Sequence, residues 1–94
     1  MFQLVVNRGF EKGTVFPLQE GDNVVGRAQS CPIQLKAADV SRRHLVIRVS
    51  GSDAVAENLS GAICLLDGAP LQAPAPMRDG QRFTLGNSTI LMLR

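Results

Sequence analysis

The chain has 94 residues, a net charge of +2 and neither tryptophan nor tyrosine. This length suits one domain with a small hydrophobic core, and ten Lys and Arg against eight Asp and Glu are too evenly balanced for bulk nucleic-acid binding. The scarcity of aromatic side chains also argues against a stacking platform for bases or sugars.

Short apolar segments separated by Gly, Pro, Asn and Asp turns recur along the chain. They predict β-strands at residues 2–6, 13–18, 23–26, 32–35, 45–49, 54–58, 63–66, 82–85 and 89–93. The proline-rich stretch between residues 66 and 82 is expected to be a loop. This pattern is typical of an antiparallel β-sandwich or barrel.

The strongest helical competitor is the segment 37–49. No apolar stripe of period 3.6 runs through it, and its second half is rich in Val and Ile. We therefore expect a loop that presents side chains, followed by a strand from Leu45 to Val49.

The domain organisation and the compartment follow from what the sequence lacks. No linker, repeat, secretory signal or apolar run of membrane-spanning length is evident, which predicts a single cytoplasmic domain over residues 1–94. Because the chain stops inside an apolar strand, we expect one module of a longer protein. Cys31 and Cys64 lack CxxC spacing and are interpreted as two partly buried thiols, with a disulfide as the open alternative.

Two predicted loops carry a cluster of cations and a hydroxyl. Gly26-Arg27 follows one strand, and Ser41-Arg42-Arg43-His44 precedes the next long one. A phosphate carries about −1.5 to −2 charge and three acceptor oxygens, and is well matched by a guanidinium fork, a hydroxyl and backbone N–H groups. Gly26 allows the backbone to approach closely. The sequence therefore predicts an anion site.

These motifs closely resemble the forkhead-associated (FHA) domain. The similarity includes residues 24–27, 31–35, 40–47, 57–60, 67–68, 71 and 77–86. It covers nearly the whole chain with plausible spacing. The resemblance implies an all-β, antiparallel β-sandwich of about eleven strands, with loops at one end that bind phosphothreonine peptides.

The resemblance also assigns roles by position. Arg27 and Ser41 are expected to contact the phosphate with help from Arg42, while Gly26 and His44 support the loops. The expected rim of the site is formed by Lys36, Arg43, Ser60 and Gly61. The resemblance implies no metal or cofactor.

The chain departs from the family pattern in one loop. Where the family carries a run such as Thr-Asn-Gly-Thr, residues 61–64 read Gly-Ala-Ile-Cys. The missing Thr and Asn would have bonded the phosphate and the peptide main chain, a loss of about 1–3 kcal/mol. Ile63 resists positive φ, so we expect a different loop shape. A register shift that brings Asn58 into the gap would dislodge the strand pattern and is not expected.

Two smaller departures occur elsewhere in the match. Pro32 stands where the family usually has Asp, and Asp67 replaces a common Asn.

Two functions stay open at this point. The first is phosphothreonine-peptide recognition in kinase-linked signalling, with a kinase or a kinase substrate as partner and a monomer as the default state. The second is a phosphorylation-independent scaffold, for example in a secretion assembly, which Ala62 and Ile63 favour. For Arg27, the competing structural interpretation is an ion pair with a carboxylate such as Asp39.

An enzyme is not predicted. The sequence shows no paired carboxylates near a nucleophile, no metal-ligand cluster and no Gly-rich nucleotide loop. His44 has no Cys or Ser-His-Asp partner with which to act, so we expect it to be structural.

Overall fold

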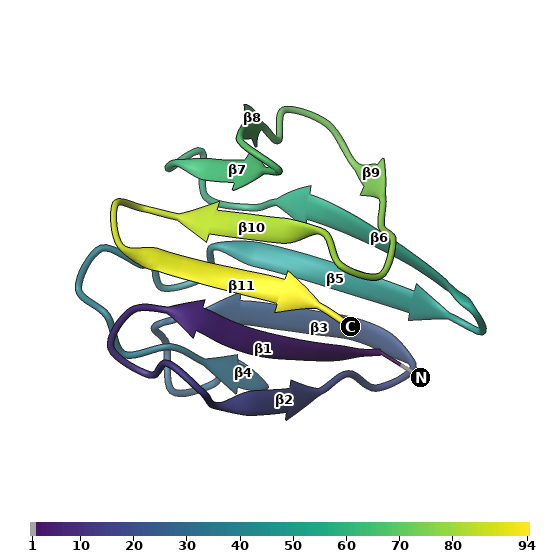
Figure 1. Ribbon diagram of the computed structural model, residues 1–94, viewed down its shortest axis with the longest axis horizontal. Helices are drawn as coiled ribbons and strands as arrows, with labels where there is room; N and C mark the ends of the chain where they lie inside the picture. Colours follow the sequence, from purple (N-terminus) through teal and green to yellow (C-terminus); the bar gives the residue numbers. More distant parts are fainter. Residues whose placement is uncertain (1) are drawn as a thin grey trace.

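The computed structural model describes residues 2–94, which form a sandwich of two β-sheets (Figure 1). Its eleven strands are β1 Gln3–Arg8, β2 Val15–Pro17, β3 Gly21–Gly26, β4 Ile33–Gln34, β5 Leu45–Ser50, β6 Asp53–Asn58, β7 Cys64–Leu66, β8 Ala69–Pro70, β9 Ala75–Pro76, β10 Arg82–Leu85 and β11 Thr89–Leu93. Within these residues, no helix is long and apolar enough to cross a membrane.

The two sheets differ in strand order. One holds six strands in the order β2-β1-β11-β10-β7-β8, and the other holds five in the order β4-β3-β5-β6-β9. The pairing is antiparallel except between β3 and β4, where Val25 lies opposite Ile33 in a parallel pair. The first and last strands are neighbours, with Leu4 opposite Leu93.

The core lies between the two sheets, and alternation along each strand supplies it. From the six-stranded sheet, Leu91 and Leu93 on β11 and Phe83 on β10 are fully buried. From the five-stranded sheet, Ile47 and Ala56 belong to the same core cluster and are also fully buried. This packing makes the sandwich a firm support for the loops at its ends.

The prediction of an all-β sandwich is confirmed, and each of the nine predicted strands has a counterpart. The segment 37–49 contains no helix, and its strand begins at Leu45 as predicted. The proline-rich stretch differs from prediction because it contains β8 and β9, which are two residues long and lie at sheet edges. Proline is tolerated at an edge, where its missing N–H leaves no ladder bond unmade.

One end of the sandwich gathers the β1–β2, β3–β4, β4–β5, β6–β7 and β10–β11 connections, at the left of Figure 1. Backbone hydrogen bonds join four of these loops in two pairs. The N–H of Arg27 donates to the carbonyl of Ser41 at 2.9 Å, and that of Gly86 donates to Ile63 at 3.1 Å. We call this surface the loop end.

Candidate anion-binding site

Arg27 follows the last residue of β3 and is held there by its own side chain. Its Nε donates to the carbonyl of Val40 at 3.1 Å, while its backbone N–H donates to Ser41. The two terminal amino groups of the guanidinium make no hydrogen bond or ion pair with residues 2–94, and the side chain is exposed. Arg27 therefore presents an oriented, unneutralised fork to solvent.

The backbone of Arg42 crosses directly against Gly26. A Cβ placed on Gly26 would lie 2.2 Å from the Arg42 carbonyl oxygen and 2.7 Å from its carbonyl carbon. That oxygen also accepts from the Ala28 N–H at 3.0 Å and from the Cys31 thiol at 3.2 Å. The absence of a side chain at Gly26 thus allows the β3–β4 and β4–β5 loops to come into contact.

The β4–β5 loop presents the remaining predicted ligands. Ser41 is half-buried, and its hydroxyl makes no hydrogen bond within residues 2–94. The Arg42 and Arg43 side chains are exposed, and neither forms an ion pair in this part of the chain. A hydroxyl and three guanidinium groups consequently stand on two joined loops.

His44 is completely buried and lies between two loops. Its Nδ1 accepts from the Ser41 N–H at 3.0 Å, and its Nε2 lies 2.8 Å from the Ile63 carbonyl. These partners assign the neutral tautomer with the proton on Nε2. Burial is the main cause that lowers the pKa of His44, so the ring stays neutral near pH 7. His44 therefore ties the β4–β5 loop to the β6–β7 loop.

The β6–β7 loop is ordered by its own side chains. Asn58 donates from Nδ2 to the Ala62 carbonyl at 3.0 Å and accepts at Oδ1 from both the N–H and the hydroxyl of Ser60, each at 3.1 Å. The Ser60 hydroxyl in turn accepts from the Ala62 N–H at 3.0 Å. Gly61 takes the left-handed conformation with φ 72°. This loop keeps Asn58 in the register of β6, opposite Leu45.

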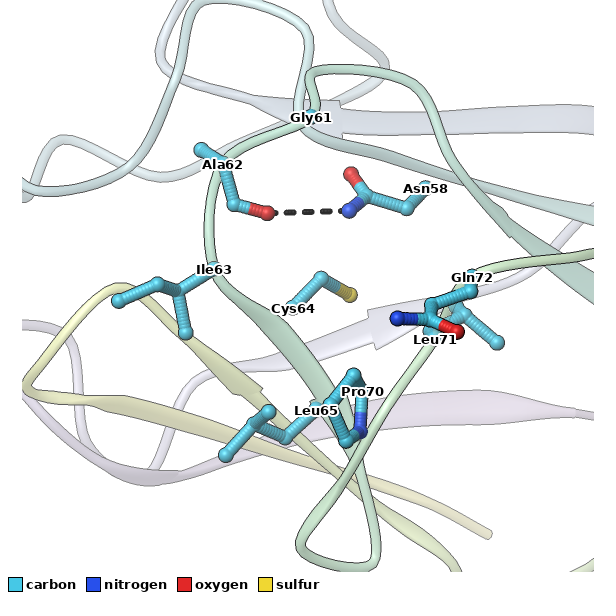
Figure 2. Close-up of a pocket in the computed structure, with 9 residues that line it drawn as sticks. All are labelled: Asn58, Gly61, Ala62, Ile63, Cys64, Leu65, Pro70, Leu71 and Gln72. Atoms are coloured by element: carbon cyan, nitrogen blue, oxygen red, sulfur yellow. Dashed lines mark hydrogen bonds between the residues drawn. The ribbon is translucent and has the colours of Figure 1, made fainter.

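A pocket of about 270 Å³ lies beside this loop (Figure 2). The Asn58 amide, the Cys64 sulfur and Leu71 with Gln72 surround it, whereas the side chains of Ala62 and Ile63 point away from it. Burial raises the pKa of the Cys64 thiol to about 11, so the thiol stays protonated and unreactive. Both cysteines are buried and free, which contradicts the disulfide alternative.

Lys36 and Glu11 connect the β1–β2 loop to the site. A Glu11 carboxylate oxygen accepts from the backbone N–H of Lys36 at 2.9 Å, and the Lys36 side chain is exposed. Lys36 therefore belongs to the same loop end as Arg27 and Ser41, as does Arg43.

Asp39 does not pair with Arg27. Its Oδ2 accepts from the Asn87 N–H at 2.8 Å and from the N–H and hydroxyl of Ser88 at 3.0 and 2.9 Å. The Asn87 bond, followed by the Ser88 hydroxyl, lowers the pKa of this carboxyl. Sequence inspection missed this role because the partners lie 48 and 49 residues away and no local motif marks the contact.

Replacing Asp39 is expected to destabilise the loop end. We expect Asp39→Ala to lower the free energy of unfolding by about 1 kcal/mol, since the lost bonds are partly replaced by water at this solvent-accessible position. Chemical denaturation at pH 7 measures the change, with Asp53→Ala at the far end as control. The lowered pKa makes this contribution present above the ordinary carboxyl pKa of 3.8, and it is lost as the pH falls through the folded value. An equal effect of the two substitutions would contradict the assignment.

Comparison of the chain with known proteins identifies its family. The family described as "Inner membrane component of T3SS, cytoplasmic domain" matches residues 5–94. FHA domain-containing protein FhaA of Mycobacterium tuberculosis is 36% identical over 81 residues. That match covers 85% of the chain, and the chain spans 15% of the length of FhaA.

Two solved structures agree with this chain over nearly its whole length. The FHA domain of FhaA, crystallised with the intracellular domain of Rv3910, superposes with a TM-score of 0.88 at 32% identity and full coverage of both chains. A structure from work on phosphothreonine-dependent FHA domain interactions gives a TM-score of 0.88 at 33% identity, covering 99% of this chain and 94% of the other. The chain is therefore a forkhead-associated domain and belongs to the family described as the cytoplasmic domain of the inner membrane component of T3SS.

Proposed function

We propose that this domain binds phosphothreonine segments of a partner protein and acts as an interaction module rather than as an enzyme. The observation that carries the proposal is the joining of the two cationic loops, where the Arg27 N–H donates to Ser41 at 2.9 Å. The relative at 33% identity comes from a study of phosphothreonine-dependent FHA interactions, which supports the same activity here. The domain then serves as one module of a longer, cytoplasmic-side protein.

The chemistry of the loop end suits a phosphate dianion. Arg27 and Ser41 supply a guanidinium fork and a hydroxyl donor, and Arg42 adds a second charge. Charge-assisted hydrogen bonds contribute about 1.5–3 kcal/mol each. Ala62 removes one expected contact to the peptide main chain, so the affinity we propose is modest.

A titration with matched peptides tests the proposal. We expect backbone NMR shifts at residues 27 and 41–42 with a degenerate phosphothreonine peptide pool and none with the unphosphorylated pool. Arg27→Ala is expected to weaken binding about 10- to 100-fold, because it removes one or two charge-assisted bonds. Arg78→Ala, which removes an exposed arginine near the far end, is the matched control. Equal binding of both pools, or none at millimolar peptide, would overturn the proposal.

A second candidate is a phosphorylation-independent scaffold. Two observations favour it: the family match to a secretion-system component and the presence of Ala62 where the family carries a peptide-holding Asn. Under this function, partner binding survives Arg27→Ala. The same variant therefore distinguishes the two candidates.

A further inference from the structure

Charge is distributed unevenly between the two ends of the sandwich. The loop end carries six of the ten cationic side chains but only two of the eight carboxylates, which gives it a net charge of +4 and leaves −2 on the rest. The six cations are Arg8, Lys12, Arg27, Lys36, Arg42 and Arg43. Such a field attracts an anionic partner over a wider area than one phosphate covers.

Within the described residues, no ion pair neutralises the cations of the loop end. Glu11 and Asp39, its two carboxylates, accept hydrogen bonds from backbone N–H groups. Within residues 2–94, the ion pairs join Arg48 to Asp22 and Glu57 on the face of the five-stranded sheet. The cations of the loop end are therefore available to an external partner.

Exposed apolar side chains gather at the same end. Phe10 is 80% exposed, Ile63 52%, Val15 46% and Leu59 39%, and these are the exposed large hydrophobic residues of the described chain. Phe10 and Val15 belong to the β1–β2 connection or border it, while Leu59 and Ile63 lie in the β6–β7 loop. Aromatic side chains that stand free beside cations are typical anchors of protein interfaces.

The β1–β2 loop, residues 9–14, is held against the loop that carries Ser41. The 2.9 Å bond from the Lys36 N–H to the Glu11 carboxylate joins them. Phe10 and Lys12 are the neighbours of Glu11 in sequence, so this bond keeps their backbone near the loop that carries Ser41. The loop end thus offers a second contact region beside the phosphate site.

We propose that the β1–β2 loop is a second binding surface, which recognises an acidic segment with apolar residues that flanks the phosphothreonine of the partner. This inference rests on the proposed function. Its chemistry follows from charge complementarity with Arg8 and Lys12 and from the exposed ring of Phe10. The domain measures 24 × 23 Å across its two shorter axes. An extended flank of about seven residues spans that width, at roughly 3.3–3.6 Å per residue.

Two phosphothreonine peptides that differ only in the flank test the inference. The flank of one peptide contains Glu and Leu, and the flank of the other contains Gln and Ser at the same positions. Each peptide is synthesised in two versions, with the flank before and after the phosphothreonine. At about 50 mM salt we expect the acidic flank to bind about 10-fold tighter on one of the two sides. At about 0.5 M salt this advantage should fall below about 3-fold, because the screening length shortens.

Substitutions of two exposed residues then test whether the β1–β2 loop contacts the peptide flank. Lys12→Glu is expected to remove at least about 5-fold of the preference for the acidic flank, and Phe10→Ala about 2-fold, which is the apolar part that survives at high salt. Both residues are exposed, so the fold should be unaffected. Arg78→Glu makes the same change of charge near the opposite end and is expected to leave the preference unchanged.

The possible outcomes separate this inference from the proposed function. If both phosphopeptides bind equally, the second surface is refuted and phosphothreonine binding stands. If neither binds, both proposals fall. Vesicles with about 30% phosphatidylglycerol are the remaining arm. The inference is overturned if the domain shows no flank preference but sediments with these vesicles, and if Phe10→Ala and Lys12→Glu abolish that sedimentation. The surface would then bind lipid.

Discussion

Gly26→Ala is expected to lower the free energy of unfolding by about 3 kcal/mol or more. The added methyl group would lie 2.2 Å from the Arg42 carbonyl oxygen and 3.0 Å from the Arg43 Cα, both of which are backbone atoms. Neither can turn away as a side chain can, so the β4–β5 loop must shift as a whole. Overpacking of this kind costs about 1–3 kcal/mol and sometimes more, a large part of the stability of a small domain.

Gly51→Ala provides the matched control for this prediction. Gly51 lies in the β5–β6 turn with φ 61°, and a Cβ there meets no heavy atom within 4 Å. The control therefore reports only the backbone cost of an L-residue in the left-handed region, about 1–2 kcal/mol. Urea denaturation of the two variants measures the difference. A smaller loss for Gly26→Ala than for Gly51→Ala would contradict the close approach seen here.

The sequence predicted most strands of this domain because they depend on local patterns of apolar and turn residues. The Val- and Ile-rich run from Leu45 and the turns around it identify a strand without tertiary information. The pairs Ala69–Pro70 and Ala75–Pro76 carry no alternation and contain proline. They become strands only because β7 and β6 offer them a partner.

The sequence indicated which residues lie together at the loop end, but not the contacts that hold them there. Gly26 was expected to allow a close approach, yet only the structure identifies the Arg42 carbonyl as the neighbour. Asp39 was considered as a counter-ion for Arg27, whereas it binds the β10–β11 turn across the sandwich. Both contacts depend on chain packing, which local sequence patterns do not encode.

The β6–β7 loop shows a further limit of inference from one motif. Ala62 stands where the family carries an Asn that holds the peptide main chain, and Ile63 led us to expect a different loop shape. In the structure, Asn58 and Ser60 hold the loop through four hydrogen bonds of their own. The loop therefore stays ordered without an Asn at position 62.

His44→Phe is expected to lower the free energy of unfolding by about 3 kcal/mol at pH 7. The ring position remains filled, but the Ser41 N–H and the Ile63 carbonyl lose their partner at the junction of two loops. Each unsatisfied group costs about 1–3 kcal/mol. Denaturant unfolding measures the loss, and the 2.9 Å bond from the Leu59 N–H to the His44 carbonyl should survive because it belongs to the backbone.

The pH dependence distinguishes the imidazole bonds from ring packing. Burial disfavours the charged imidazolium and is the main cause that lowers the pKa of His44. A second ring proton would sit on Nδ1, which faces the Ser41 N–H and has no acceptor there. The unfolded chain then binds more protons than the folded chain as the pH falls below about 6.5, and stability decreases in that range. One proton limits the slope to about 1.4 kcal/mol per pH unit.

This titration can be assigned to one residue because His44 is the only histidine in the chain. Ordinary carboxylates titrate below this window and the Cys64 thiol titrates far above it. We expect the stability of the wild-type domain to fall between pH 7 and pH 5, and that of His44→Phe to stay nearly flat. Parallel curves would show that the ring contributes packing alone. A decrease confined to the wild type would mean that the neutral His44 ring links the β4–β5 loop to the β6–β7 loop and that its protonation destabilises the fold.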